Sequence, residues 1–287
     1  MQTTRREFLA HAAMGAGAAL SLAWPRTTWA EAQPWPVRVG SCMIGLEAAK
    51  KAGLDGVQIG LQLVGDKLDV ADADKRRDYK RQMQETGLPI CALMMGLLNR
   101  YPLATDPRGP AWLEQAIDAA KDLGAKSILV AFFSNGDLLD KNGKVKQDDV
   151  DAVVTRLKAA APRARDAGVA LAIEDYLDVH QNIEILDRVG QDSVQIWYDV
   201  YNTGGTKGYD VPAEIRLLKN RISQFHFKNG RQYLGEGKLN FPAIAEAIKD
   251  IGYKDWIVLE TSSPSGDTIA DARRNGEYVR KLFGNLG

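Results

Sequence analysis

The chain has 287 residues, of which 45% are hydrophobic and 26% are charged, and its 37 basic and 37 acidic residues leave no formal net charge. This profile excludes a disordered or low-complexity chain and suits one large globular α/β domain. Without the first thirty residues, 34 Lys and Arg oppose 36 Asp and Glu, so the remaining chain has no basic excess for binding a nucleic acid.

Residues 1–30 have the pattern of a twin-arginine signal peptide. Arg5 and Arg6 precede an apolar run rich in Ala and Gly, and residues 28–30 (Thr-Trp-Ala) supply a small-x-small cleavage pattern. The apolar run is too short to span a bilayer. We therefore expect the twin-arginine export machinery to carry the chain to the periplasm or another exported location. Cleavage after Ala30 would leave a mature domain, residues 31–287, without a membrane segment.

From residue 37 onward, short apolar runs alternate with amphipathic stretches about eight times. The amphipathic stretches, among them residues 46–53, 73–87, 110–124 and 148–168, read as helices, and several end in Gly. Apolar strands that alternate with helices favour a parallel sheet, and eight such units predict a single (β/α)8 TIM barrel. An open doubly wound sheet is the alternative, but no Gly-x-Gly-x-x-Gly motif follows the first run to support it. The apolar runs cover residues 37–42, 56–61, 88–95, 126–133, 169–174, 194–200, 221–227 and 256–261.

The two cysteines are expected to be free thiols. Cys42 and Cys91 fall in the first and third apolar runs. Neighbouring strands lie ~5 Å apart, so two such spacings put these residues beyond easy disulfide reach.

Four side chains of the types that bind metals stand at the ends of four consecutive apolar runs: Glu174, Asp199, His226 and Glu260. The carboxyl ends of parallel strands meet on one rim of a barrel, where such folds keep their chemistry. Side-chain alternation turns all four residues inward, together with Trp197 and Lys228, and turns Tyr198 outward. Each residue alone could be a solvated strand end, a turn residue or a core histidine. Three carboxylates and an imidazole in this order predict a site for one divalent cation.

Several segments near these residues together resemble the xylose isomerase-like barrel superfamily, in its sugar isomerase and epimerase branch. The resemblance covers essentially the whole mature chain and is strongest over residues 169–262. The segments that carry it are EDY (174–176), WYDVYNTGG (197–205), FHFKN (225–229), LGEGKLNF (234–241) and IGYKDWIVLE (251–260).

The resemblance implies a role for each of these residues. The four-residue set would bind one divalent cation, most often Mn²⁺, with Mg²⁺, Co²⁺ and Zn²⁺ as alternatives, and Glu174 and Glu260 would exchange the substrate proton. Lys228 matches the His-x-Lys pattern of many members, and Asn202 stands where many have His. Arg231 falls near a substrate-binding Arg of some epimerases. The remaining candidate substrate contacts are aromatic rings that could stack on a sugar: Tyr176, Trp197 and Tyr201.

Three functions stay open on the sequence. The first is an exported isomerase or epimerase that moves a proton next to the carbonyl of an unphosphorylated sugar or keto-sugar. The second is a lyase that eliminates the aglycone from 3-keto-glycosides, and the third is a non-catalytic sugar-binding barrel. The endonuclease branch of the superfamily is disfavoured, because it needs several metals and many histidines whereas the mature chain has only His180 and His226. The expected partner is a small sugar or glycoside, and the oligomeric state, including a homo-oligomer, is left open.

Overall fold

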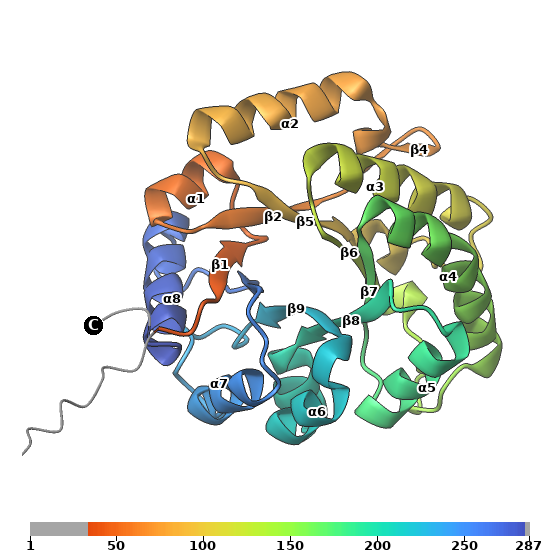
Figure 1. The fold of residues 1–287 in the computed structure, drawn as a ribbon. Helices are drawn as coiled ribbons and strands as arrows, with labels where there is room; N and C mark the ends of the chain where they lie inside the picture. Colours follow the sequence, from red (N-terminus) through yellow and green to blue (C-terminus); the bar gives the residue numbers. More distant parts are fainter. Residues whose placement is uncertain (1–33, 285–287) are drawn as a thin grey trace, which may run out of the picture. The chain divides into compact units, whose positions relative to one another are not determined.

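Eight parallel strands close into a barrel in the computed structural model, which describes residues 34–284 (Figure 1). Around the barrel the strands follow the order β1-β10-β9-β8-β7-β6-β5-β2. Each strand lies within one of the eight apolar runs, so the predicted (β/α)8 barrel is confirmed. The barrel strands are β1 (Arg38–Ser41), β2 (Gly56–Gly60), β5 (Ile90–Met95), β6 (Ser127–Ala131), β7 (Ala170–Glu174), β8 (Val194–Asp199), β9 (Ile222–Phe227) and β10 (Trp256–Leu259).

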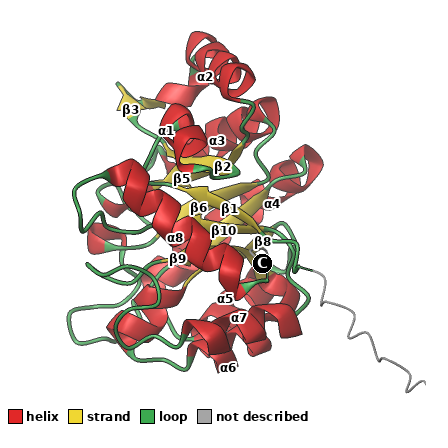
Figure 2. Ribbon diagram, turned by 90° about the vertical axis from the view of Figure 1, so that its left-hand side faces the viewer, coloured by secondary structure: helices red, strands yellow, loops and turns green. Residues whose placement is uncertain are grey.

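Helices surround the barrel and cover its outer face (Figures 1 and 2). Five of them end at a glycine in the left-handed conformation, as the sequence predicts, and α7 ends two residues before such a glycine, Gly252. Within the described range, every helix is too short or too polar to cross a lipid bilayer. The helices are α1 (Leu46–Ala52), α2 (Ala73–Thr86), α3 (Gly109–Leu123), α4 (Gln147–Ala167), α5 (Val179–Val189), α6 (Val211–Leu218), α7 (Phe241–Asp250) and α8 (Thr268–Leu282).

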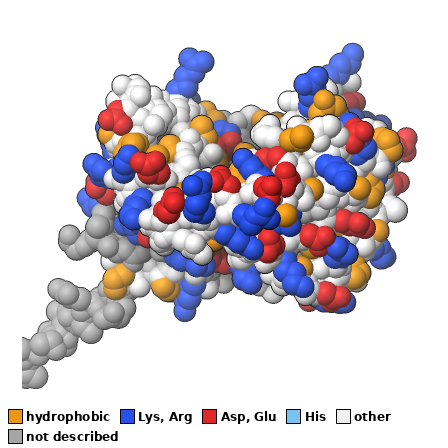
Figure 3. Space-filling view, turned by 90° about the horizontal axis from the view of Figure 1, so that it is seen from above, with side chains coloured by type: hydrophobic (Ala, Val, Ile, Leu, Met, Phe, Trp, Pro, Cys, Tyr) orange, Lys and Arg blue, Asp and Glu red, His pale blue; other side chains and the backbone are white. Residues whose placement is uncertain are grey.

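Short elements in the connecting loops were not predicted from the sequence. A two-stranded hairpin follows β2, and a π-helix directly follows β8. On the face shown in Figure 3, basic and acidic side chains are intermixed, in keeping with the balanced charge of the chain. The short elements are β3 (Leu63–Val64), β4 (Lys67–Leu68), the π-helix η4 (Tyr201–Lys207) and the 3₁₀ helices η1 (Asp69–Ala71), η2 (Gly96–Asn99), η3 (Ser134–Gly136) and η5 (Lys219–Arg221).

The barrel interior confirms the predicted alternation of side chains. Trp197 points inward, whereas Tyr198 points outward and donates a hydrogen bond to Glu214 on α6, with 2.8 Å between the oxygens. Both cysteines are free thiols, as predicted. The interior residues below the rim are Cys91, Ala92, Leu129, Ala131, Ala172, Trp197, Trp256 and Val258.

The two ends of the described chain meet away from the rim. The backbone N–H of Trp35 donates to the carbonyl oxygen of Phe283 at 2.9 Å, and the Trp35 indole N–H donates to the carbonyl oxygen of Tyr253 at 2.6 Å. Trp35 precedes β1 and Phe283 follows α8, so this junction lies at the amino-terminal ends of the strands.

Packing in the lower part of the barrel interior requires a small residue, Gly56, beside the large side chain of Trp256. A Cβ atom added to Gly56 would lie 2.7 Å from the Trp256 ring and 2.8 Å from the carbonyl oxygen of Pro89. These distances are shorter than van der Waals contacts, so no side chain fits at this position on β2 unless its neighbours move.

We expect Gly56→Ala to lower the free energy of unfolding by about 1–3 kcal/mol, because the added methyl group overpacks the interior. The matched change Gly96→Ala should stay within about 0.5 kcal/mol of the wild type, because its Cβ would meet no atom within 4 Å in the described part of the chain. Urea unfolding measures both values. Equal stability of the two variants would contradict this packing.

Candidate metal centre

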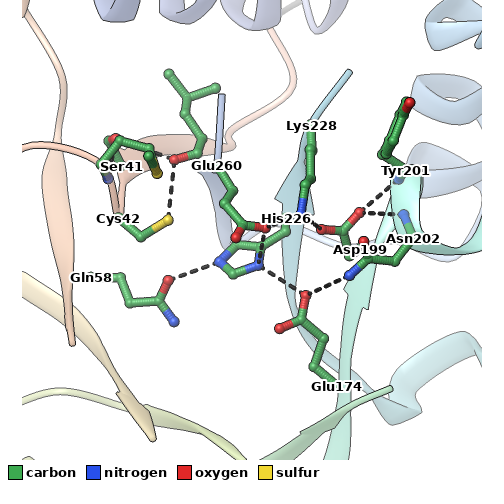
Figure 4. A network of polar contacts seen from close by, with 12 residues as sticks. Ser41, Cys42, Gln58, Glu174, Asp199, Tyr201, Asn202, His226, Lys228 and Glu260 are labelled. Carbon is green, nitrogen blue, oxygen red and sulfur yellow. Dashed lines mark hydrogen bonds and ion pairs between the residues drawn. The ribbon is translucent and has the colours of Figure 1, made fainter. Parts of the chain in front are cut away.

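Four side chains converge at one rim of the barrel, and we call them the Glu–Asp–His–Glu cluster: Glu174, Asp199, His226 and Glu260 (Figure 4). One ligand atom from each residue can be chosen so that all four atoms lie within 4.8 Å of one another. Glu174 and Asp199 end β7 and β8, His226 lies near the end of β9, and Glu260 directly follows β10. The convergence predicted from the sequence is therefore present in the structure.

The pairing register of neighbouring strands brings these four side chains together. Asp199 pairs with His226 across β8 and β9, and His226 pairs with Val258 across β9 and β10, two residues before Glu260. The register between β8 and β9 shifts between Ile196 and Trp197, just before Asp199. Such irregularities often re-aim a side chain next to an active site.

The two carboxylate oxygens of Asp199 differ in their surroundings. Oδ1 accepts hydrogen bonds from the backbone N–H groups of Tyr201 and Asn202, at 2.7 and 2.8 Å, and so caps the π-helix η4. Oδ2 is buried and has no hydrogen-bond partner among residues 34–284. One oxygen therefore anchors the loop, and the other faces the cluster and can bind a ligand. Single turns of π-helix are frequent at functional sites.

The imidazole ring of His226 is fully buried and is held on three sides. Its Nδ1 atom lies 3.1 Å from Oε1 of Glu174 and 3.5 Å from Oε2 of Glu260. Its Nε2 atom lies 2.8 Å from Oε1 of Gln58, and the Trp197 ring meets it at a centroid distance of 4.8 Å and an interplanar angle of 64°. The ring therefore presents Nδ1 to the carboxylates.

Burial and mutual repulsion shift the ionisation of the cluster. Burial raises the pKa of Glu174, and it raises the pKa of Asp199 to about 8 with a further contribution from neighbouring carboxylates. Burial alone would lower the pKa of His226, but the Glu174 carboxylate raises it well above its usual value. Burial alone would raise the pKa of Glu260, yet His226 and Lys228 hold it below its usual value. The carboxylates are therefore short of compensating positive charge.

A divalent cation fits this cluster. Three carboxylates and one imidazole form a mixed oxygen and nitrogen set that suits divalent ions between Mg²⁺ and Zn²⁺ in character. Ligands on opposite sides of an ion with ligand distances of about 2.1 Å lie roughly 4.2 Å apart, close to the observed spacing. Asp199 Oδ2 has no hydrogen-bond partner within the described residues and lies 3.9 Å from the Lys228 ammonium, so it can also bind such an ion.

The other predicted site residues divide into two groups. Lys228 and Asn202 contact the cluster: Lys228 Nζ lies 3.1 Å from Glu260 Oε2, and Asn202 Nδ2 lies 3.5 Å from Glu174 Oε1. The second group does not contact its carboxylates through side-chain hydrogen bonds or ion pairs within the described residues. Its members are Tyr176, Trp197, Tyr201 and Arg231.

Packing explains the positions of this second group. Trp197 is 1% exposed beneath the His226 ring, so it supports the imidazole and has no open face on which a sugar could stack. Tyr176 is half-buried and meets Phe133 edge-on, with ring centroids 4.8 Å apart. The Tyr201 ring packs against Gly205 and Gly230, and Arg231 is exposed. Only Tyr176, Tyr201 and Arg231 retain surface for a substrate.

Sequence reasoning missed Gln58, which hydrogen-bonds His226 from β2, a strand separated from β9 by β1 and β10. A signal for it was present, because Gln58 is the only polar residue in the run Gly56–Leu61 and has the parity of an inward-facing position. A polar side chain in the middle of a buried strand needs a partner in the interior.

Comparisons with known proteins agree with this geometry. Residues 46–282 match the family described as xylose isomerase-like TIM barrel. An L-ribulose 3-epimerase of Mesorhizobium japonicum is 25% identical over 232 residues, which cover 76% of this chain and 74% of that protein.

Two solved structures show the same fold. The D-allulose 3-epimerase of Methylomonas sp. superposes with a TM-score of 0.71 at 19% identity, covering 87% of this chain and 99% of its own. The 3-keto-D-glucoside 4-epimerase of Escherichia coli superposes with a TM-score of 0.68 at 16% identity, covering 86% and 98%.

We predict that Mn²⁺ at a hundred times its dissociation constant stabilises the protein by about 2.7 kcal/mol, which raises Tm by roughly 5–10 °C. Asp199→Asn should abolish this shift, because it keeps the Oδ1 cap and replaces the free Oδ2 with an amide nitrogen. The matched control is Asp175→Asn, which changes a buried carboxylate next to Glu174 and should retain the shift. Differential scanning fluorimetry with and without Mn²⁺ measures this rise in Tm. A wild-type rise in Asp199→Asn would show that Asp199 is not a ligand.

Proposed function

We propose that this chain, which belongs to the xylose isomerase-like TIM barrel family, is a metal-dependent enzyme that moves a proton beside the carbonyl of an unphosphorylated sugar or keto-sugar. The convergence of the Glu–Asp–His–Glu cluster on one rim carries the proposal. Similarity to an L-ribulose 3-epimerase supports the reaction class. Mn²⁺ is the ion we propose, with Mg²⁺, Co²⁺ and Zn²⁺ as alternatives.

The positions of the two glutamates support the proton transfer proposed for them. Removal of a proton beside a carbonyl develops negative charge on oxygen, and a bound divalent cation supplies several kcal/mol of stabilisation for that charge. Glu174 and Glu260 reach the site from β7 and from the end of β10, with β8 and β9 between them. One carboxylate can therefore take the proton while the other, as a carboxylic acid, returns one from a different side. Each such transfer contributes ~10²–10⁴-fold to the rate.

Two neighbouring side chains orient these carboxylates. The Lys228 ammonium group lies 3.1 Å from Glu260 Oε2, and the Asn202 amide lies 3.5 Å from Glu174 Oε1. Both donors lie beside the proposed acid and base, so we propose that they also bind substrate hydroxyl groups. Arg231, Tyr176 and Tyr201 remain proposed contacts for more distant parts of the substrate.

The charge at the cluster supports an unphosphorylated substrate. Three carboxylates bring three negative charges, which a divalent cation and the Lys228 ammonium together neutralise, since His226 is neutral when it binds a metal. A phosphate group would add about two negative charges and would need its own cations. Arg231 is exposed and makes no ion pair to the cluster within the described residues, so it adds no positive charge there.

The same residues support a second reaction, elimination of the aglycone from a 3-keto-glycoside. In such a substrate the C2 proton lies beside the carbonyl. When a glutamate removes this proton, a C1=C2 double bond forms, the bond from C1 to the aglycone oxygen breaks, and an acid protonates the departing oxygen. The shared fold of a 3-keto-D-glucoside 4-epimerase makes keto-glycosides a reasonable substrate class for the test.

We expect turnover in D₂O to introduce deuterium at the carbon beside the carbonyl, because a glutamate exchanges protons with solvent between removal and return. For elimination, a substrate deuterated at C2 should react with a primary isotope effect. Mass spectrometry of free ketoses, glycosides and 3-keto-glycosides incubated with Mn²⁺-loaded protein measures both. Turnover without either signal would contradict proton transfer, and tight binding of a sugar without turnover or exchange would favour the non-catalytic barrel.

The exchange should depend on the two glutamates. Glu174→Gln and Glu260→Gln should each lower turnover by about 10²–10⁴-fold at saturating Mn²⁺, because an amide cannot move the proton. The matched control is Glu214→Gln on α6, where the glutamate is also buried but accepts hydrogen bonds from Tyr198 and Val179 outside the barrel interior. This control should keep wild-type turnover.

We also propose that the protein is exported by the twin-arginine pathway. Arg5, Arg6 and the cleavage pattern that ends at Ala30 support this proposal, and all of them lie outside the residues that the structure describes. The proposal agrees with an unphosphorylated substrate, since sugar phosphates are chiefly cytoplasmic metabolites.

We predict that replacing both Arg5 and Arg6 with Lys keeps the protein in the cytoplasm with its full N-terminus, because the pathway recognises the arginine pair. The wild-type protein should be recovered outside the cytoplasm with Glu31 as its first residue. Cell fractionation followed by intact-mass analysis measures both outcomes. Equal export of the two forms would contradict the proposed route.

A further inference from the structure

Gln58 crosses the barrel interior to reach the cluster. It lies in the middle of β2, is 2% exposed, and places Oε1 2.8 Å from Nε2 of His226 on β9 (Figure 4). Along the barrel wall β1 and β10 separate β2 from β9, so this hydrogen bond spans the interior. Gln58 and His226 are 168 residues apart in sequence, and the contact forms only once the barrel is closed.

The contact favours one of the two nitrogens of His226 as the one that keeps its proton when the ring is neutral. An amide oxygen can only accept a hydrogen bond, so Nε2 of the ring donates its N–H to Gln58. The lone pair of the neutral ring is then on Nδ1, the atom that lies 3.1 and 3.5 Å from the carboxylates of Glu174 and Glu260. The opposite amide orientation would present a donor to Nε2 and leave the proton on Nδ1, where it would block coordination.

A glutamine suits this position better than a carboxylate. A Glu at residue 58 would accept the same hydrogen bond but would add a fourth carboxyl group to a space in which three already repel one another. The neutral amide orients the ring without adding charge. Trp197 packs edge-on against the same ring at 4.8 Å and limits its rotation, so both the tilt and the tautomer of the imidazole are set.

We propose that Gln58 is a positioning residue that keeps Nδ1 of His226 available to a divalent cation. The inference rests on the metal-dependent function proposed above and deepens it. Partners that hydrogen-bond the second nitrogen of a metal-binding histidine typically contribute about 10–100-fold to metal affinity.

The first test compares Mn²⁺ affinities by electron paramagnetic resonance titration. Gln58→Met removes the acceptor but fills similar space, and should weaken binding by about 10–100-fold. Gln58→Glu restores an acceptor and should bind more tightly than Gln58→Met. The matched control is Gln224→Met: Gln224 is also buried, lies two residues before His226 on β9, and makes no hydrogen bond to its ring within the described residues. This variant should bind as the wild type does.

The second test observes the tautomer itself. The mature chain contains only His180 and His226, so ¹⁵N-histidine NMR of the Zn²⁺-loaded protein can assign both rings. The wild type should show a slowly exchanging proton on Nε2 of His226 and none on Nδ1, and Gln58→Met should show faster exchange at Nε2. A proton on Nδ1 in the loaded wild type would overturn the proposal.

The outcomes separate this inference from the proposed function. Equal Mn²⁺ affinities for Gln58→Met and the wild type would overturn the role of Gln58 and leave the metal-dependent function intact. A wild-type protein that binds no divalent cation would overturn both.

Discussion

The repulsion of three carboxylates in one nearly dry space is the constraint on which the rim of this barrel depends. Two like charges 4 Å apart repel by roughly 4 kcal/mol at an effective dielectric constant of 20. Glu174 and Asp199 are 5% and 2% exposed, so water screens them little. Lys228 lies within 4 Å of both Asp199 and Glu260, and the His226 ring lies against Glu174. A site that concentrates charge in this way costs stability unless a ligand relieves it, and such local conflicts are typical of functional sites.

The rim has a charged side and a mostly apolar side. Every member of the cluster comes from β7 to β10, whereas the half-buried residues packed against the interior from the remaining strands include Met94 and Phe133, and Gln58 adds one neutral amide from β2. Apolar walls lower the local dielectric constant and so strengthen the interactions of the charges opposite them. The mostly apolar side therefore strengthens the electrostatic interactions of the cluster and also shapes the site.

Much of the barrel was predictable because the sequence patterns that indicate its strands and helices are local. Each strand is an apolar run, and most helices end at glycine, so the strand ends and the residues on them followed from the sequence. Inward parity also predicted that the cluster would converge. The complete burial of Trp197 was not predictable, because side-chain alternation shows that a residue points inward but not which residues cover it. The π-helix depends on a cap from Asp199 and on Tyr201 packing against Gly230, a contact between separate loops. The partner of Gln58 lies too far along the chain for any local pattern to reveal.

The junction between Trp35 and Phe283 bears on the stage at which the protein acquires its cation. It holds both ends of the described chain at the amino-terminal ends of the strands, while the cluster occupies the opposite rim. Both ends of the described chain are therefore at the end of the barrel opposite the rim. For a protein that folds before it crosses a membrane, the cation can then be acquired in the compartment of synthesis while the leader is still attached. Under the export route proposed above, the metal content of the protein would record the ion supply of the cytoplasm, not that of the place where it works.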